Sequence, residues 1–428
     1  MALPQQKLDS TEARLSAMTL PPSQGWLGKA REDALARVRT MGLPSRRDEY
    51  WKYTRPDTLV QQDAPKAALY NMGEAPVFSN IDRLHLIFVD GVFDPDASDD
   101  LELSGVSVEL LSKVGDKDIH WATGLYGSLE QAGQSPVQRP LAALNSAFAT
   151  DGVMIHVSAV ATKPINISYL HRDETSDACL HHVIKLDEGA KLTLLENGPA
   201  AARLNKVLEV DVANGAEFRH IRTQGRAHER RAATHIFGRL GQNSVFKSFT
   251  LTANGALTRN ECVLKLQGDN AVAHIAGACV GDGDFHHDDT VFITHNAADC
   301  ESRQVFKKVL RNGATGVFQG KILVNQIAQK TDGYQISQSL LLDGDSQFLA
   351  KPELEIYADD VACSHGSTSG AIDEECLFYL KSRGVPHAQA MNLLVLAFLA
   401  EAVAEIDEEE IANEINGRLA DWLERRMN

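Results

Sequence analysis

The sequence lacks the features that define secreted and membrane-spanning proteins. Its six cysteines lie at positions 179, 262, 279, 300, 363 and 376, and none of them forms a C-x-x-C pair. This spacing is neither a disulfide framework nor a zinc ribbon, so reduced thiols in the cytoplasm are the simplest interpretation. The N-terminus has no apolar segment of the signal-peptide kind. The longest apolar run, Leu393 to Ala400, is far shorter than the roughly 20 residues that cross a bilayer, so no membrane association is expected.

An excess of positive charge and a phosphate-binding loop are also missing. Asp and Glu number 58 against 42 Lys and Arg, which gives a formal net charge of −16. Such a field repels a nucleic-acid backbone, and no basic stripe offsets it, so no nucleic-acid partner is expected. The run Gly316-x-x-x-Gly320-Lys321-Ile322 has the wrong spacing for a phosphate loop and no Ser or Thr after the lysine. Neither a nucleophile elbow nor a Rossmann fingerprint follows a predicted strand. We therefore expect a protein that is not an enzyme and does not hydrolyse ATP alone.

Residues 1–150 are predicted to form an N-terminal helical region with a small α/β portion. One helix is expected to start from a cap at Asp9 or Ser10, and another covers Gly28 to Met41. Residues 84–93, LHLIFVDGVF, predict two strands joined by a turn. Helices are expected again over 101–113 and 140–148.

The central region, residues 151–367, is predicted to consist almost entirely of short strands. Apolar and polar residues alternate in segments such as KLTLLE, VFKSFTLT and KILVNQI. Turn sequences rich in Gly, Asn and Asp separate these segments at spacings of about 13–15 residues or small multiples of that. A strand region of this length fits either a large sandwich or a β-helix, and composition does not decide between them.

The last region, residues 368–428, is predicted to be a helical domain. Helices are expected over 373–382, from Pro386 to about 406, and over about 408–426, with Gly384 closing the first. The second helix is apolar nearly all round, which is typical of burial in a core or a partner interface. A tail of this size is small for an independent core, which favours docking on a partner.

The run Cys363-Ser364-His365-Gly366 is the strongest candidate for chemistry. Side chains at i and i+2 of a strand share a face, so a thiol and an imidazole lie side by side, and both bind soft or borderline metals. Two ligands do not complete a tetrahedral site, so a second strand or a second chain must supply the others. The alternative is a core cysteine beside a histidine that is satisfied by the backbone. Adjacent histidines point to opposite faces of a strand, so His181-His182 and the His286-His287-Asp288-Asp289 run are interpreted as polar groups, the latter in a loop.

Three stretches resemble the SufB/SufD family of iron–sulfur cluster assembly proteins. They are GLPSRRDEYWKYT at 42–54, FQGKILVNQIAQKTDGYQISQSLLL at 318–342, and the C-S-H-G run with its acidic helix and S-R-G. SufB-type chains carry a functional cysteine shortly after the leucine triplet, where this sequence has Ser346. A serine neither accepts a persulfide sulfur nor ligates iron softly, so the resemblance is closest to the SufD branch. The resemblance implies a right-handed parallel β-helix core flanked by N-terminal and C-terminal helical domains.

The same resemblance implies a scaffold subunit of the SufB–SufC–SufD complex, in which two copies of the SufC ATPase serve one SufB and one SufD. His365, with Cys363, would hold a transient iron or iron–sulfur cluster shared with a SufB-like subunit. A reduced flavin has been linked to the family's complex, and no cofactor is expected to bind tightly to the chain alone. A homodimer is possible when the partners are absent. Residues expected to contact the SufC-like ATPase are Tyr379, Arg383, Met391, Leu394 and Phe398.

Two other classes of function remain open at this point. A β-helix enzyme that acts on polysaccharide needs clustered carboxylates or basic residues along an exposed groove, and such enzymes are usually secreted. A purely structural interaction protein would leave the Cys363–His365 pair inert.

Overall fold

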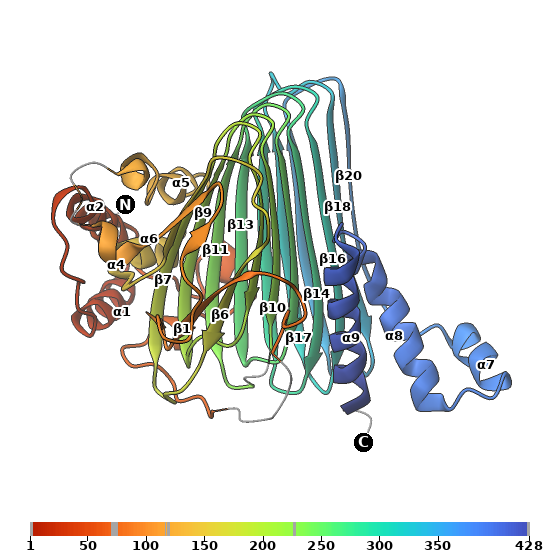
Figure 1. Ribbon diagram of the computed structural model, residues 1–428. Helices are drawn as coiled ribbons and strands as arrows, with labels where there is room; N and C mark the ends of the chain where they lie inside the picture. Colours follow the sequence, from red (N-terminus) through yellow and green to blue (C-terminus); the bar gives the residue numbers. More distant parts are fainter. Residues whose placement is uncertain (1–2, 70–75, 116, 118–119, 226–227, 426–428) are drawn as a thin grey trace.

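The centre of the molecule is a parallel β-solenoid (Figure 1). The computed structural model describes residues 3–69, 76–115, 117, 120–225 and 228–425. Within that part of the chain there are two sheets of ten strands each, and from β5 onward successive strands alternate between them. The β-helix expected from the family resemblance is therefore confirmed, and the sandwich is excluded.

From β6 onward, each sheet grows by addition of every second strand of the chain. Sheet A has the order β2 (Val92–Phe93), β1 (Leu84–Val89), β6 (Ile165–Leu170), β8 (Lys191–Asn197), β10 (Glu217–Gln224), β12 (Val245–Ala253), β14 (Val272–Asp282), β16 (Glu301–Arg311), β18 (Thr331–Leu341), β20 (Val361–Gly370). Sheet B has the order β19 (Gln347–Ile356), β17 (Thr315–Val324), β15 (His286–His295), β13 (Leu257–Leu266), β11 (Arg231–Leu240), β9 (Arg203–Val212), β7 (Asp177–Leu186), β5 (Val153–Val157), β4 (Val106–Leu110), β3 (Glu102–Leu103).

The turns between strands follow the chemistry read from the sequence. Asn254 and Asn312 adopt φ of 69° and 55°, in the left-handed region that asparagine tolerates better than most residues. Strand pairing is in register from coil to coil, so that Phe218 lies beside Leu192 on one side and Phe246 on the other. Stacks of this kind form the main apolar core between the two sheets.

Helices of the N-terminal region cover the outer face of sheet B, on the left of Figure 1. Arg259 lies at the centre of this contact, with its guanidinium 4.2 Å from the centroid of the Trp51 ring and paired to Glu261 and Asp288. The RRDEYWKYT segment is therefore held against sheet B by a buried ionic cluster. The helical elements are α1 (Gln5–Ser16), α2 (Gly25–Met41), η1 (Glu49–Trp51), α3 (Asp57–Val60), α4 (Leu111–Val114), η2 (Trp121–Gly124), α5 (Ser128–Ala132) and α6 (Pro140–Phe148).

Two N-terminal expectations were wrong. The helix expected over 101–113 is instead β3 and β4 followed by the single turn α4, because Val106 and Val108 point inward in alternation and β4 pairs with β5. The first helix begins at Gln5, with Pro4 at its N-cap position, so neither Asp9 nor Ser10 caps it.

The C-terminal helices cover the outer face of sheet A. They are α7 (Glu374–Ser382), α8 (His387–Val403) and α9 (Glu409–Arg425). Val395 and Leu399 of α8 join Ile415 and Leu419 of α9 in one buried cluster with Phe249 and other outward residues of sheet A. Asp373 caps α7 by accepting a hydrogen bond from the Cys376 N–H, and Gly384 closes it with φ of 86°. No helix of the described residues is long and apolar enough to span a bilayer.

Candidate functional site

The C-terminal end of the solenoid is open. β20 ends sheet A and β19 ends sheet B, and in the described ranges no strand lies beyond either. The residues of β20 are exposed or half-buried throughout, whereas those of β16 are almost all buried. An edge strand leaves a row of backbone N–H and C=O groups unpaired, which proteins usually protect with lysine, proline or a bulge. The β20 sequence VACSHGSTSG has no lysine or proline, and its ladder with β18 runs without a bulge. This edge is therefore suited to pairing with another strand.

The structure places Cys363 and His365 together on this edge strand. They lie opposite Gly333 and Gln335 of β18 in the ladder. Cys363 is half-buried and packs with the apolar cluster of Ile322 and Val324. Gly333 leaves room for this thiol, because a Cβ added at Gly333 would lie 3.1 Å from Cys363 Sγ. Burial raises the pKa of the Cys363 thiol, while the backbone N–H of Gly333 opposes the shift. His365, two residues on, is exposed.

The pair offers an incomplete set of metal ligands. Among the described residues, no group of three or more His, Cys, Asp or Glu side chains lies close enough to hold a metal ion. Cys363 and His365 therefore supply at most two donors, one soft and one borderline. Any stable coordination at this edge requires donors from a second chain or from the bound species itself.

A row of polar side chains leads from the solenoid interior to His365. The buried Gln335 donates a hydrogen bond from Nε2 to Oε1 of Gln304 over 2.8 Å, and His365 is the next residue along that row. Parallel rows join the hydroxyls of Ser337 and Ser367, and those of Ser339 and Ser369, each over 3.0 Å. The sequence analysis made no prediction for the alternation Gln-Ile-Ser-Gln-Ser at 335–339.

Further inside, ionisable groups form a buried network between the sheets. Glu196 accepts hydrogen bonds from Tyr169 and Lys206, and from Nε2 of His220 over 2.7 Å. On later coils, Lys308 pairs with Asp289 and lies 2.8 Å from Nδ1 of His287. Asn260 extends the second part, because its Nδ2 donates to Gln224 Oε1 over 3.1 Å and lies 3.2 Å from Nε2 of His287. Its Oδ1 accepts from Thr234, which in turn accepts from the buried Arg222. The network was missed from sequence because alternating polar residues in a strand are normally assigned to the solvent side.

Burial sets the pKa values of this network. It lowers the pKa of Lys206 to about 8 although Glu196 opposes the shift. It also lowers the pKa of His220 to about 4 and that of His182 to about 3. The Glu196 carboxyl, by contrast, has its pKa held well below the ordinary value, because Lys206 and His220 outweigh the opposing effect of its own burial. At neutral pH the network thus contains a charged Glu–Lys pair and neutral histidines.

The other histidine runs have structural partners. His286 and His287 begin β15, so the loop expected for them is wrong, and they point to opposite faces. His286 lies 2.9 Å from the Thr54 hydroxyl on the outside, while His287 faces inward to Lys308. His181 contacts Glu209 over 2.9 Å on the outer side of β7.

Ser346, the residue that the sequence comparison set against the SufB-type cysteine, lies in the turn before β19. Its backbone N–H donates to Asp343 Oδ1 over 2.8 Å, and its side chain is buried. The hydroxyl of Ser346 offers no soft ligand.

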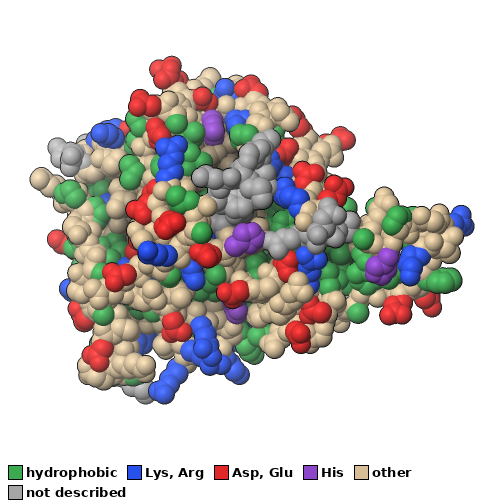
Figure 2. Space-filling model, turned by 90° about the horizontal axis from the view of Figure 1, so that it is seen from below, with side chains coloured by type: hydrophobic (Ala, Val, Ile, Leu, Met, Phe, Trp, Pro, Cys, Tyr) green, Lys and Arg blue, Asp and Glu red, His purple; other side chains and the backbone are tan. Residues whose placement is uncertain are grey.

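Helix α7 projects from the body of the molecule, and none of its residues is buried (Figures 1 and 2). Tyr379 is 56% exposed, and the Arg383 guanidinium lies 5.0 Å from its ring. Phe378, which the sequence analysis omitted, is more exposed still, at 73%. Met391 and Leu394 are half-buried on the first turns of α8. Phe398 lies toward sheet A instead, with Lys307 Nζ 5.0 Å from its ring. We call the exposed surface of Phe378, Tyr379, Arg383 and Leu393 the α7 arm.

Comparisons with known proteins agree with this architecture. Residues 169–398 match the family model for the SUF system FeS cluster assembly SufBD core domain, and residues 16–167 match the SufBD protein N-terminal region. The iron-sulfur cluster assembly protein SufD of Escherichia coli is 29% identical over 91% of each chain. The protein ABCI7, chloroplastic, of Arabidopsis thaliana is 24% identical over 98% of this chain and 90% of its own length. The SufD protein of Bacillus subtilis is 25% identical over 65% of each chain.

Proposed function

Because this chain belongs to the SufB/SufD family of iron–sulfur cluster assembly proteins, and is most like SufD, we propose that it is the SufD-type scaffold subunit of a SufB–SufC–SufD complex. The observation that carries the proposal is the open end of the solenoid, with His365 exposed on its last strand. In this proposal a SufB-like subunit pairs with the β20 edge and buries His365 in the interface.

Iron, or the nascent cluster, is the cargo of this interface. Cys363 and His365 supply at most two donors, and the SufB-like partner supplies the others. The neutral imidazole is the donor best placed to act, because it is exposed, whereas the Cys363 thiol is half-buried with a raised pKa. Cys363 then serves mainly to pack the strand beneath the histidine.

The α7 arm is the proposed docking surface for the SufC-like ATPase. Its aromatic and aliphatic side chains are exposed although the rest of the C-terminal region buries its apolar face on sheet A. Helix α8 continues from this arm to β14 and β16, where Glu401 pairs with Lys307, and Glu405 contacts His274 over 3.1 Å. A displacement of the arm by ATP-driven closure of two SufC subunits would reach sheet A through these contacts.

Two further expectations belong to the same proposal. In the absence of the SufB-like partner, a second copy of this chain occupies the open edge and gives a homodimer, which light scattering on the purified chain would measure. The reduced flavin implied by the family resemblance stays a prediction for the assembled complex, which its absorbance spectrum would test.

The scaffold role is favoured over the two alternatives. A polysaccharide-active β-helix enzyme has no support from the related proteins, which are named as iron–sulfur cluster assembly proteins. A purely structural role for the Cys363–His365 pair is separated from the cluster role by the following experiment.

The test is His365→Ala in the complex reconstituted with SufB-like and SufC-like subunits. Loss of the imidazole is expected to lower iron and cluster content per complex several-fold, while the melting temperature of the chain alone changes little because the side chain is exposed there. The neighbouring Ser364→Ala, an exposed residue on the opposite face of the same strand, is the matched control.

Iron content is measured on the assembled complex, and the melting temperature is measured on the same batch of chain before assembly. Normal iron content in folded His365→Ala complex refutes the cluster role. Loss of the SufB-like subunit from the Ser364→Ala complex would show that the edge does not tolerate truncation, and His365→Gln, which keeps a polar side chain of similar size, then provides the second test.

A further inference from the structure

The interior-facing side chains of β18 and β20 meet in register at the open end of the solenoid. The hydroxyl of Ser337 donates to that of Ser367 on the next strand over 3.0 Å. Gln335 and His365 are the neighbouring pair of the same ladder, two residues before these serines and on the same face. Since Gln and His side chains are longer than those of serine, this register brings the amide within reach of the imidazole.

Gln335 carries a buried acceptor without a partner. The side chain is fully buried, and its Nε2 donates to Gln304 Oε1 over 2.8 Å. In the part of the chain that the structure describes, Oε1 of Gln335 forms no hydrogen bond. A Cβ added at Gly320 of sheet B would overlap this amide, so the glycine makes room for it. Because the nitrogen is engaged with the preceding strand, His365 is the next group along the row that the oxygen can meet.

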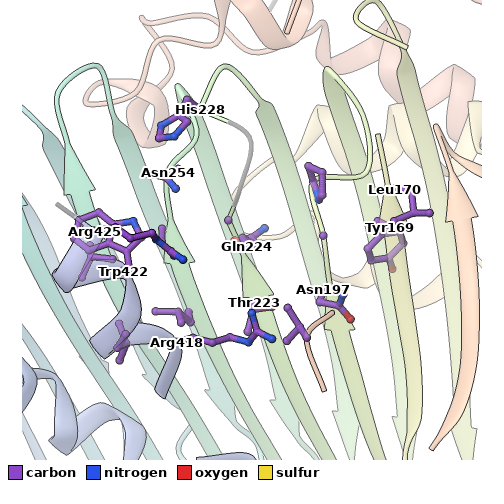
Figure 3. A pocket seen from close by; sticks show the side chains of 18 residues that line it. Tyr169, Leu170, Asn197, Thr223, Gln224, His228, Asn254, Arg418, Trp422 and Arg425 are labelled. Carbon is purple, nitrogen blue, oxygen red and sulfur yellow. The ribbon is translucent and has the colours of Figure 1, made fainter. Parts of the chain in front are cut away.

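The cavity beneath α9 does not serve this oxygen. That cavity has a volume of about 420 Å³ and lies on the outer face of sheet A, where Leu251 and Val280 line it together with Leu419 of α9 (Figure 3). On the sheet side, its described lining comes from β6 to β14. Gln335 faces the interior from β18, so a partner for its oxygen has to come from the open end itself.

The chemistry of imidazole gives such an acceptor a use. A neutral imidazole has one N–H and one nitrogen with a lone pair, so only one ring nitrogen is available to a metal. A metal-binding histidine almost always donates its N–H to an oxygen acceptor, which fixes the tautomer and the orientation of the ring. Gln335 Oε1 is an acceptor of this kind, and its burial makes an unpaired state costly.

We propose that Gln335 is the positioning residue of His365. Its Oε1 accepts the ring N–H, so the other ring nitrogen is turned outward and presents its lone pair to the iron. This inference rests on the proposed role of His365 in the cluster interface, and it adds a requirement within this chain. A partner that covers the open edge strengthens the hydrogen bond, because it excludes the water that competes for the imidazole.

The test is Gln335→Met in the complex reconstituted with SufB-like and SufC-like subunits. Methionine keeps the length of the side chain and removes the acceptor. The affinity of the complex for ferrous iron, measured by anaerobic competition with a chelator, is expected to fall about 10-fold or more. Gln304→Met is the matched control, because it is equally buried and breaks the same hydrogen bond but leaves Gln335 Oε1 in place. Its iron affinity is expected to stay near that of the wild type.

Two further variants show whether Gln335 acts through His365. In the His365→Ala background, Gln335→Met is expected to cause no further loss of iron affinity, because the group that it positions is gone. Gln335→Glu keeps an acceptor oxygen on a side chain of the same length, so it is expected to recover most of the affinity that methionine loses. A merely structural role for Gln335 would produce neither result.

Four results would overturn the inference. They are wild-type iron affinity in Gln335→Met, equal losses in Gln335→Met and Gln304→Met, a further loss in the His365→Ala background, and a folded Gln335→Glu complex as weak as the methionine variant. If His365→Ala weakens iron binding and Gln335→Met does not, only this inference fails; if neither weakens it, the proposed function fails as well.

Gel filtration shows whether each variant complex assembles. Should the Gln335→Met complex not assemble, the variant that combines it with Gln304→Met takes its place. Two apolar side chains then replace a hydrogen-bonded pair and leave no polar atom of that pair unpaired. Iron affinity in this variant equal to that of Gln304→Met would overturn the inference.

Discussion

The buried Glu196–Lys206 pair gives the sharpest test of how the solenoid interior is stabilised. Glu196 is fully buried and accepts hydrogen bonds from three side chains, those of Tyr169, Lys206 and His220. The proposed change is Glu196→Gln, which keeps the size and shape of the side chain. It replaces one carboxylate oxygen by an NH₂ group, which then faces existing donors.

The size of the effect follows from the charge left behind. Without Glu196, the Lys206 ammonium is buried beside Arg222 with no counter-ion. Removal of one partner of a buried pair typically costs about 3–5 kcal/mol. The pKa of Lys206, already lowered to about 8, falls further, so the lysine folds in its neutral form and limits the loss to this range. A second variant, Glu196→Gln with Lys206→Met, removes the stranded charge and should recover most of the lost stability.

The measurement is urea unfolding of the wild type and the variants, followed by far-ultraviolet circular dichroism. Free energies are compared only between proteins whose m-values agree. Glu217→Gln is the control, because Glu217 lies on the outer side of β10 and its partners Lys191 and Arg219 are largely solvated. Its loss should change the free energy of unfolding by less than about 1 kcal/mol.

Equal losses in the free energy of unfolding for Glu196→Gln and Glu217→Gln would contradict this prediction. It also fails if the double variant is as unstable as the single one, because the penalty would then not arise from the uncompensated lysine.

Three further predictions concern the N-terminal contact, the buried histidines and the α7 arm. Trp51→Ala should destabilise the chain by about 3–5 kcal/mol, since it removes a buried ring from under Arg259, whereas the half-exposed Tyr53→Ala should cost much less in the same urea titration. The free energy of unfolding should fall as the pH drops from 6.5 toward 4. The loss is up to about 1.4 kcal/mol per pH unit for each buried histidine, because the unfolded chain takes up protons that the folded chain excludes. Melting temperatures that stay level from pH 7 to 5 would contradict this. Burial lowers the pKa to about 3 for His182 and to about 4 for His220, His235 and His295. Phe378→Ala with Tyr379→Ala should abolish co-purification of the SufC-like ATPase with no change in melting temperature, because both side chains are exposed; retained binding would place the docking surface elsewhere.

The strand region and the C-terminal helices were accessible from sequence because local signals determine them. Asp373 and Gly384 mark the ends of α7 through their own hydrogen-bonding and backbone preferences. Asparagine and glycine turns likewise separate the strands of the solenoid at nearly constant spacing. Sandwich and solenoid differ in which strands pair, and pairing is a long-range property that alternation does not encode. The family resemblance supplied that missing information.

The interior network could not be predicted because a period of two defines two faces without saying which one is buried. In β10 the polar His220, Arg222 and Gln224 face the interior, while Ile221 faces the C-terminal helices. Alternation alone assigns them the other way round. The helix expected over 101–113 failed for a related reason, since Val106 and Val108 gain more from pairing with β5 than their neighbours gain from a helical turn.

The open edge also determines how the molecule loses structure. In a solenoid each coil touches only its neighbours, so stability propagates from coil to coil as in a one-dimensional chain. The coil of β19 and β20 has a neighbour on one side in the described part of the chain, and its residues are the least buried. Amide hydrogens should therefore exchange fastest at this end and progressively more slowly toward β12. A partner that pairs with β20 would act as a missing terminal cap, and amide exchange in the strand that carries His365 would slow at the moment of assembly.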